Sequence, residues 1–241
     1  MQTIKAPRPQ TFRAHLFDLD GVITSTALVH MRAWDEMFSE FLETRGIEEP
    51  YTERDYFDYV DGKPRYDGVR SFLASRGIEL PEGTPEDSPD AETVAGLGNR
   101  KNDRVLAMIR EEGVEPYPGT VAYLDSLGED ALLAVVSSSK NADEVLRGAG
   151  LRDRFAHVVD GNVASAEGIP GKPAPDTFSH AARLLGAEDT DCVVYEDAVS
   201  GVRAGAAGGF GLVVGVDRGV GHEVLADAGA DVVVSDLEEL L

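Results

Sequence analysis

Two aspartates stand at the first place in this sequence where side chains could do chemistry. Asp18 and Asp20 lie in AHLFDLDGVITST, where a short apolar run ends and the chain turns at Gly21. In extended backbone, residues i and i+2 point the same way, so both carboxylates can face one point beyond a strand. Like charges this close oppose folding unless a bound cation offsets their repulsion or a catalytic role requires it. An ordinary Asp-Gly turn is the alternative, and this motif alone leaves both readings open.

A second acid pair decides between them. Glu196 and Asp197, in VVYEDAVSGVRAG, follow another apolar run and precede a segment rich in small residues. Four carboxylates at neighbouring strand ends, with no cluster of cysteine or histidine nearby, form a hard, all-oxygen donor set. Mg²⁺ suits such a set best, usually keeping some waters and bridging to a substrate phosphate. The sequence therefore predicts a magnesium site built from Asp18, Asp20, Glu196 and Asp197.

Two lysines stand where a site for an anion would need them. Lys172 lies in GIPGKPAPD, where two prolines stiffen the chain, and Lys140 lies in VVSSSKN. Hydroxyl groups such as that of Ser137, together with the start of a following helix, can hydrogen-bond an anion next to Lys140. For either lysine taken alone, a solvated loop charge is the commoner reading.

The elements that must position these residues are short, β-rich and apolar. Six such runs occur, and most of those after residue 130 alternate with segments of helical composition: 14–18, 131–138, 155–161, 191–197, 211–216 and 230–236. This alternation predicts an α/β, Rossmann-like parallel sheet flanked by helices. In such sheets the binding crevice lies at the carboxyl ends of the strands, where four of the runs carry polar residues.

A helical insertion interrupts this pattern after the first strand. Apolar residues from Leu28 onward recur at helical spacing, and three segments end in a glycine followed by an apolar residue and a proline, as a helix C-terminus does. We therefore expect a discontinuous core domain of residues 11–27 and 116–241. Residues 28–115 form a small all-helical domain inserted in it. Its acidic, proline-rich stretch LPEGTPEDSPDAE is expected to be a solvated loop.

Taken in order, the motifs DLDGVIT, VVSSSKN, GKPAPD and YEDAVSGV resemble those of the haloacid dehalogenase (HAD) superfamily, most closely its β-phosphoglucomutase-like branch. The resemblance covers nearly the whole chain from Arg13 and includes the insertion, which corresponds to the family's cap. It implies Asp18 as the nucleophile that becomes an aspartyl phosphate and Asp20 as general acid and base. Family members that do not process phosphoesters often lack the second acid, so Asp20 argues against dehalogenation.

The resemblance also assigns the remaining site residues. Mg²⁺ would be held by Asp18, the Asp20 carbonyl and Asp197, with Glu196 binding directly or through water. Ser137 and Lys172 would bind the transferring phosphoryl group. A second, distal phosphate would be bound by Ser139, Lys140, Asn141 and the cap residue Arg65, which follows Gly62. A surface salt bridge is the alternative for Arg65.

Further cap residues fall where the branch carries hinge and sugar-facing groups. These are Thr26, His30, Trp34 and Lys101. His30 and Trp34 are one helical turn apart and share a face, yet Trp34 fits a cap core as well as a sugar ring. The loop DGKPRYDG and the acidic loop depart from the family pattern, which leaves the sugar and its anomer open.

The resemblance predicts a phosphotransferase acting on a hexose phosphate, interconverting β-glucose 1-phosphate and glucose 6-phosphate through a bisphosphate. The alternative is a sugar-phosphate phosphatase, in which water accepts the phosphoryl group. The core motifs do not separate the two, since only the acceptor differs. A catalytically idle binding module is a third hypothesis, and the presence of every acid, hydroxyl and lysine of the four motifs argues against it.

Composition limits the partners. Twenty-two basic and 44 acidic residues give a formal net charge of −22, which repels nucleic acids and anionic membranes.

The single cysteine, Cys192, excludes an internal disulfide and lies in an apolar run, as a buried inert thiol does. The polar, proline-bearing N-terminus does not resemble a signal peptide, and no apolar stretch could span a bilayer. We expect a cytoplasmic protein with a small phosphorylated sugar as its partner; the oligomeric state is open, a monomer being compatible with the sequence.

Overall fold

The computed structural model describes residues 7–241. The segment in which no signal peptide is expected begins outside these described residues. The chain forms two compact units. The first joins the segment ending at Ser25 to Glu115–Leu241, and the second comprises Thr26–Val114. The chain leaves and re-enters the first unit at one place, since the Ser25 N–H donates to the carbonyl of Glu115.

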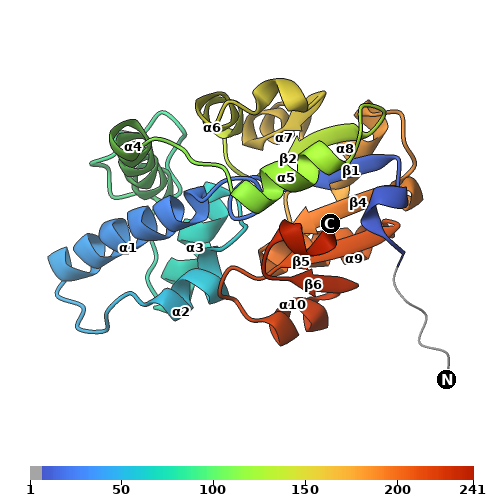
Figure 1. Ribbon diagram of the computed structural model, residues 1–241. Helices are drawn as coiled ribbons and strands as arrows, with labels where there is room; N and C mark the ends of the chain where they lie inside the picture. Colours follow the sequence, from blue (N-terminus) through green and yellow to red (C-terminus); the bar gives the residue numbers. More distant parts are fainter. Residues whose placement is uncertain (1–6) are drawn as a thin grey trace. The chain divides into compact units, whose positions relative to one another are not determined.

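The first unit is built on a sheet of six parallel strands, as the sequence predicts (Figure 1). The strands are β1 (Ala14–Phe17), β2 (Leu132–Val136), β3 (His157–Val159), β4 (Cys192–Glu196), β5 (Leu212–Val216) and β6 (Val232–Val234). Their order in the sheet is β3-β2-β1-β4-β5-β6, which places β1 at the centre between β2 and β4. The carboxyl ends of these three strands therefore meet at one edge, where a parallel sheet binds ligands.

Helices cover both faces of this sheet because its strands are apolar on both sides. Leu16, Val136 and Val194 pack with Phe178 of α8 and Ala204 of α9 in one cluster of buried residues. On the other face, Tyr195 contacts Tyr123 of α5. The helices of this unit are α5 (Pro118–Ser126), α6 (Ala142–Gly148), α7 (Gly161–Glu167), α8 (Asp176–Leu184), α9 (Val199–Gly208) and α10 (His222–Ala228), with 3₁₀ turns η1 (Pro9–Thr11), η3 (Arg152–Arg154), η4 (Asp189–Asp191) and η5 (Leu237–Leu240).

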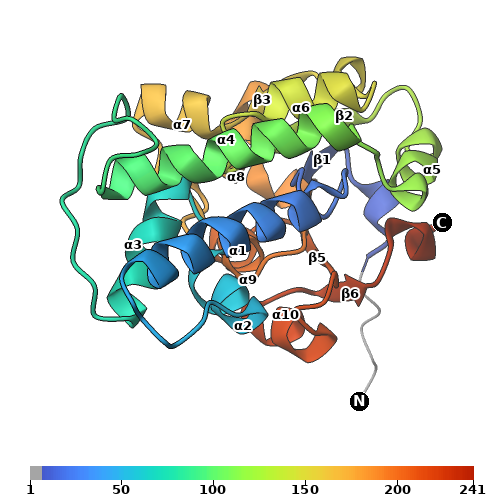
Figure 2. The ribbon, with the colours of Figure 1, turned by 90° about the vertical axis from the view of Figure 1, so that its left-hand side faces the viewer.

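The second unit is helical, and no residue of it lies in a strand. It comprises α1 (Thr26–Thr44), α2 (Glu53–Asp55), the π-helical turn η2 (Tyr56–Val60), α3 (Arg65–Ser75) and α4 (Val94–Glu112). The long helices α1 and α4 lie side by side (Figure 2). Its core is aromatic: the Phe38 ring stacks on that of Trp34 with centroids 5.2 Å apart and lies 4.1 Å from that of Phe72.

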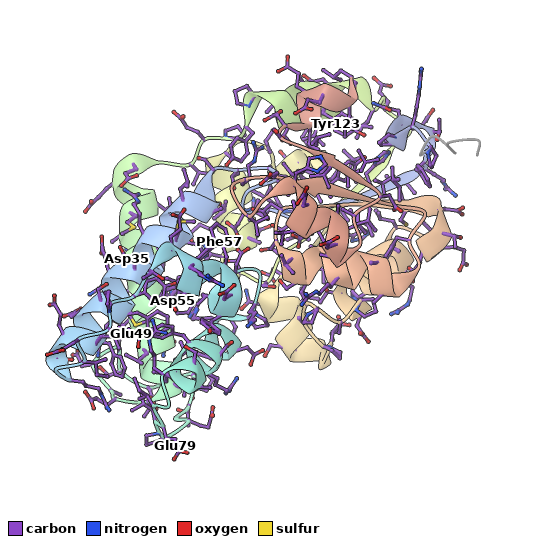
Figure 3. The ribbon with its side chains drawn as sticks, turned by 90° about the horizontal axis from the view of Figure 1, so that it is seen from below. Asp35, Glu49, Asp55, Phe57, Glu79 and Tyr123 are labelled. Carbon is purple, nitrogen blue, oxygen red and sulfur yellow. The ribbon has the colours of Figure 1, made fainter. Side chains whose placement is uncertain are left out.

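The glycine-ended helices of this unit form as the sequence predicts. Gly46, two residues after α1, has a φ of 65°, a conformation that glycine adopts without steric cost. The N–H of the next residue, Ile47, donates to the carbonyl of Leu42, which closes the helix end. Carboxylates such as Asp35, Glu49 and Glu79, labelled in Figure 3, are exposed. Among residues 7–241, no helix is long and apolar enough to cross a membrane.

Candidate active site

The register of the sheet brings the two acid motifs together. Phe17 pairs with Val135 of β2 on one side and with Tyr195 of β4 on the other. The next residue, Asp18, donates its N–H to the carbonyl of Tyr195 at 2.9 Å, so it lies directly beside Glu196. Both residues are buried at the carboxyl edge of the sheet.

Lys172 joins these two acids. Its Nζ lies 2.5 Å from Oδ1 of Asp18 and 2.6 Å from Oε1 of Glu196, and it also donates to the carbonyl of Val136 at 3.0 Å. The lysine side chain is 2% exposed and that of Glu196 is 1% exposed. The carboxyl ends of three strands, β1, β2 and β4, thus each supply an oxygen to one ammonium group.

The electrostatics of the cluster follow from burial and charge. Burial raises the pKa of Asp18 well above its usual value, Lys172 opposes this, and the carboxylates of Glu196 and Asp20 add to it. Burial alone would lower the pKa of Lys172, but attraction and hydrogen bonds from Asp18 and Glu196 raise it. The lysine therefore stays charged, and its single charge does not balance the acids around it.

Two glycines make room for the carboxylates. A Cβ atom on Gly201, in the first turn of α9, would lie 1.7 Å from Oε1 of Glu196. A Cβ atom on Gly21 would lie 1.8 Å from Oδ2 of Asp197. Any side chain at either glycine would displace a carboxylate, so the small residues after both acid motifs belong to the site. The sequence carries this signal as a glycine a few residues beyond each acid pair.

The acid cluster fits a divalent cation. Asp18, Glu196 and Asp197 each offer a carboxylate oxygen, and these atoms lie within 4.8 Å of one another. Glu196 is already engaged: Oε1 accepts from Lys172 and Oε2 from the N–H of Ala198 at 2.9 Å. Each carboxylate oxygen has two lone pairs, so these bonds leave capacity for a cation or its water. Hard oxygen donors with excess negative charge match a hard cation.

The serine-rich loop after β2 lies at the same edge and is well ordered by hydrogen bonds. Ser137 is buried, and its Oγ accepts the N–H of Ser139 at 3.1 Å, which leaves its own proton to donate. Oγ of Ser139 in turn accepts the N–H of Asn141 at 3.2 Å. The carbonyl of Lys140 accepts from the side-chain amide of Asn162 at 2.7 Å. These bonds hold the loop that the sequence predicts to bind phosphate.

The cap residues form two groups within the helical unit. Lys101 Nζ lies 2.7 Å from Nδ1 of His30 and 4.7 Å from the ring centre of Trp34. Trp34 is 4% exposed and stacks on Phe38, so the structure places it in the core of the unit, one of the two readings left open. Thr26, buried, is the first residue of α1.

Arg65 begins α3 three residues after Gly62, whose φ is 66°. The guanidinium is half-buried and donates to Oδ1 of Asn102 at 2.6 Å. A neutral amide oxygen thus orients this guanidinium. Arg218, a cation of the first unit that the motifs do not single out, follows β5 and donates to the carbonyl of Gly21 at 2.8 Å. Its position at the end of a fifth parallel strand is the signal that could have revealed it.

Comparison with known proteins agrees with the architecture and the motifs. A profile of haloacid dehalogenase-like hydrolases matches residues 12–209. A β-phosphoglucomutase of Mycobacterium tuberculosis is 50% identical over 97% of this chain and 93% of its own. One of Bacillus subtilis is 32% identical over 95% of this chain and 91% of its own. The crystal structure of a β-phosphoglucomutase from Clostridium difficile has a TM-score of 0.76 at 25% identity, covering 95% of this chain and 93% of that one. The chain belongs to the haloacid dehalogenase-like hydrolase family.

Proposed function

We propose that this protein is a β-phosphoglucomutase, which interconverts β-glucose 1-phosphate and glucose 6-phosphate through a bisphosphate. The observation that carries the phosphotransfer chemistry is the Lys172 ammonium held between the carboxylates of Asp18 and Glu196. The choice of sugar rests on the β-phosphoglucomutases named above, of which the Mycobacterium tuberculosis protein is 50% identical over 97% of this chain. Members of this family generally use Mg²⁺, which the acid cluster fits.

In the proposed reaction Asp18 is the nucleophile. One of its carboxylate oxygens forms a bond to the phosphorus at C1 of the bisphosphate while the bond between that phosphorus and the sugar oxygen breaks, which releases glucose 6-phosphate. The 6-hydroxyl of β-glucose 1-phosphate then attacks the aspartyl phosphate and regenerates the bisphosphate. Asp20 gives its proton to the departing sugar oxygen and later accepts the proton of the sugar hydroxyl that attacks the aspartyl phosphate. The phosphoryl group is thus transferred twice, and Asp18 and Asp20 return to their starting states.

Other residues of the first unit bind the transferring group. Lys172 donates to its oxygens, and the hydroxyl proton of Ser137 is available for a further hydrogen bond, so both offset negative charge as it develops. The metal would be held by Asp18, Asp197 and the carbonyl of Asp20, with Glu196 direct or through water. When bound, it would supply positive charge that lowers the repulsion between the carboxylates and the phosphate.

The helical unit is proposed to act as the cap. We assign to Arg65, with Ser139, Lys140 and Asn141, the binding of the second phosphate of the bisphosphate. Arginine suits this role because its planar fork matches two phosphate oxygens. A mutase needs such a contact, since the bisphosphate must be held at one end while the other reacts. His30, Lys101 and Gly62 are proposed to face the sugar.

The test is a product analysis. Purified protein with Mg²⁺, β-glucose 1-phosphate and a small amount of the bisphosphate should form glucose 6-phosphate, with little inorganic phosphate. Release of inorganic phosphate alone would show a phosphatase instead. A matched Asp18→Asn variant should lose both activities, and full turnover in that variant would indicate that the aspartyl phosphate is not formed.

A further inference from the structure

Arg218 lies in the loop after β5, nearly two hundred residues from the acid motif that it contacts. Its Nε donates to the carbonyl oxygen of Gly21 at 2.8 Å. We propose that Arg218 is a positioning residue, which fixes the backbone that carries Asp20. The inference rests on the proposed function, because it assumes that Asp20 transfers the proton to and from the sugar oxygen.

Gly21 is the point at which the acid motif turns, and both of its peptide groups are held. Its φ is 94°, and its N–H donates to the carbonyl of Thr24 at 2.8 Å within the loop. Its carbonyl accepts from Arg218. The first bond fixes the peptide that links Asp20 to Gly21, and the second fixes the peptide that follows. Removing the arginine would therefore release the peptide that follows Gly21, while the peptide that precedes it stays bound within the loop.

No side chain at position 21 could replace the lost constraint. A Cβ atom there would lie 1.8 Å from Oδ2 of Asp197, so the residue must be glycine. Glycine is also the residue whose backbone is least restricted. Arg218 holds the Gly21 carbonyl from outside the loop, as Thr120 Oγ1 holds the neighbouring carbonyl of Val22 at 2.7 Å.

The arginine is itself fixed on several sides, as a positioning group must be. Its Nη1 donates to the carbonyl of Ser235 at 2.9 Å, and both Nη atoms lie 3.3 Å from Oδ2 of Asp236. The guanidinium lies over the ring of Tyr117, 3.7 Å from its centre. Asp236 is held in turn, since its Oδ1 accepts the N–H of Glu238 at 3.0 Å. The planar fork of arginine serves all these partners at once, which a lysine cannot do.

The proposed role predicts a particular pattern of lost activity. Misplacing Asp20 should slow steps in which a sugar oxygen gains or loses a proton. It should hardly affect the attack of Asp18 on 4-nitrophenyl phosphate, whose leaving group departs without protonation. An arginine that merely stabilised the fold would lower both activities in proportion to the folded fraction.

The experiment compares Arg218→Gln, Arg218→Lys and the charge-matched control Arg183→Gln, whose side chain is exposed on α8. For each, kcat/KM is measured for β-glucose 1-phosphate with bisphosphate present and for 4-nitrophenyl phosphate, together with the melting temperature. For Arg218→Gln we expect a fall of about 10- to 100-fold with the sugar phosphate and less than about threefold with the aryl phosphate. Arg218→Lys should give an intermediate loss, and the control should equal the wild type.

Equal losses with both substrates, or unchanged kcat/KM with the sugar phosphate, would overturn the inference. Failure of the proposed function has a different signature: the wild type itself would release phosphate without forming glucose 6-phosphate. In that case the same comparison uses hydrolysis of the hexose phosphate, whose leaving oxygen still requires a proton. The larger loss with the sugar phosphate would then support the role of Arg218 independently.

Discussion

Replacing Lys172 with methionine removes one charge from the most buried ion cluster among residues 7–241 and keeps a side chain of similar length. The carboxylates of Asp18 and Glu196, which are 10% and 1% exposed, would then face each other without the ammonium between them. Breaking a buried ion pair by removing one partner costs about 3–5 kcal/mol. For a protein of this size we expect the melting temperature to fall by roughly 10 °C.

The assay is thermal unfolding followed by circular dichroism in the presence of a chelator, so that no metal takes the place of the lysine. A second variant, Lys172→Met with Glu196→Gln, removes one of the two negative charges left behind and should recover part of the loss. Lys140→Met, at a half-buried lysine of the same sheet edge, is the matched control and should cost about 1 kcal/mol or less.

The pH dependence of the stability loss in Lys172→Met provides a measurement that can refute this reasoning. Burial already raises the pKa of Asp18, and removing Lys172 raises it further, so in the variant the folded state binds protons more readily than the unfolded state. Such a group stabilises the folded protein at low pH and loses this contribution as the pH rises. The deficit of Lys172→Met should therefore be largest at neutral pH and shrink on acidification. A deficit below about 1 kcal/mol at neutral pH, or one that grows in acid, would refute the reasoning.

Three further predictions concern other parts of the chain. Gly201→Ala should lower kcat about 10- to 100-fold, because its Cβ would displace Glu196; unchanged kinetics would show that the carboxylate can move without consequence. Arg65→Ala should strongly reduce glucose 6-phosphate formation while aryl phosphate hydrolysis stays nearly intact, and equal loss of both would make the arginine structural. Burial lowers the pKa of His15 from 6.5 to about 4, so the unfolded state takes up its proton first and stability falls as the pH drops through this range. The loss should total about 3 kcal/mol in urea titrations and be absent from His15→Phe.

The sheet could be predicted from the sequence because its physical cause is local. Strands covered on both faces must be apolar along their length, and this pattern marks all six of them. Parallel pairing then brings their carboxyl ends to one edge, which is sufficient to gather Asp18, Ser137, Glu196 and Asp197. The ends of the cap helices follow from glycines such as Gly46, whose conformation few other residues adopt.

What the sequence could not give is which partner each polar group selects. Helical spacing places Trp34 on an apolar face but does not say what covers that face; the structure fills it with Phe38. The motifs bring Lys172 near the acids but do not predict that Glu196 shares it with Asp18. Arg218 follows a strand end, which is a weak signal by itself, and its bond to Gly21 joins residues 197 positions apart in the sequence. Contacts of this kind depend on tertiary packing rather than on local pattern.

The charges at the sheet edge explain why such a site would require a cation before it could accept its substrate. Three carboxylates lie together here, those of Asp18, Glu196 and Asp197, and two of them, Asp18 and Glu196, already pair with the Lys172 ammonium. The chain as a whole carries a formal charge of −22, so no general attraction draws an anion to it. A phosphate dianion entering this edge would meet more carboxylates than the Lys172 ammonium can balance. A divalent cation held among Asp18, Glu196 and Asp197 would offset that excess and would allow the lysine to bind the phosphoryl oxygens, so we expect substrate binding to depend on the metal.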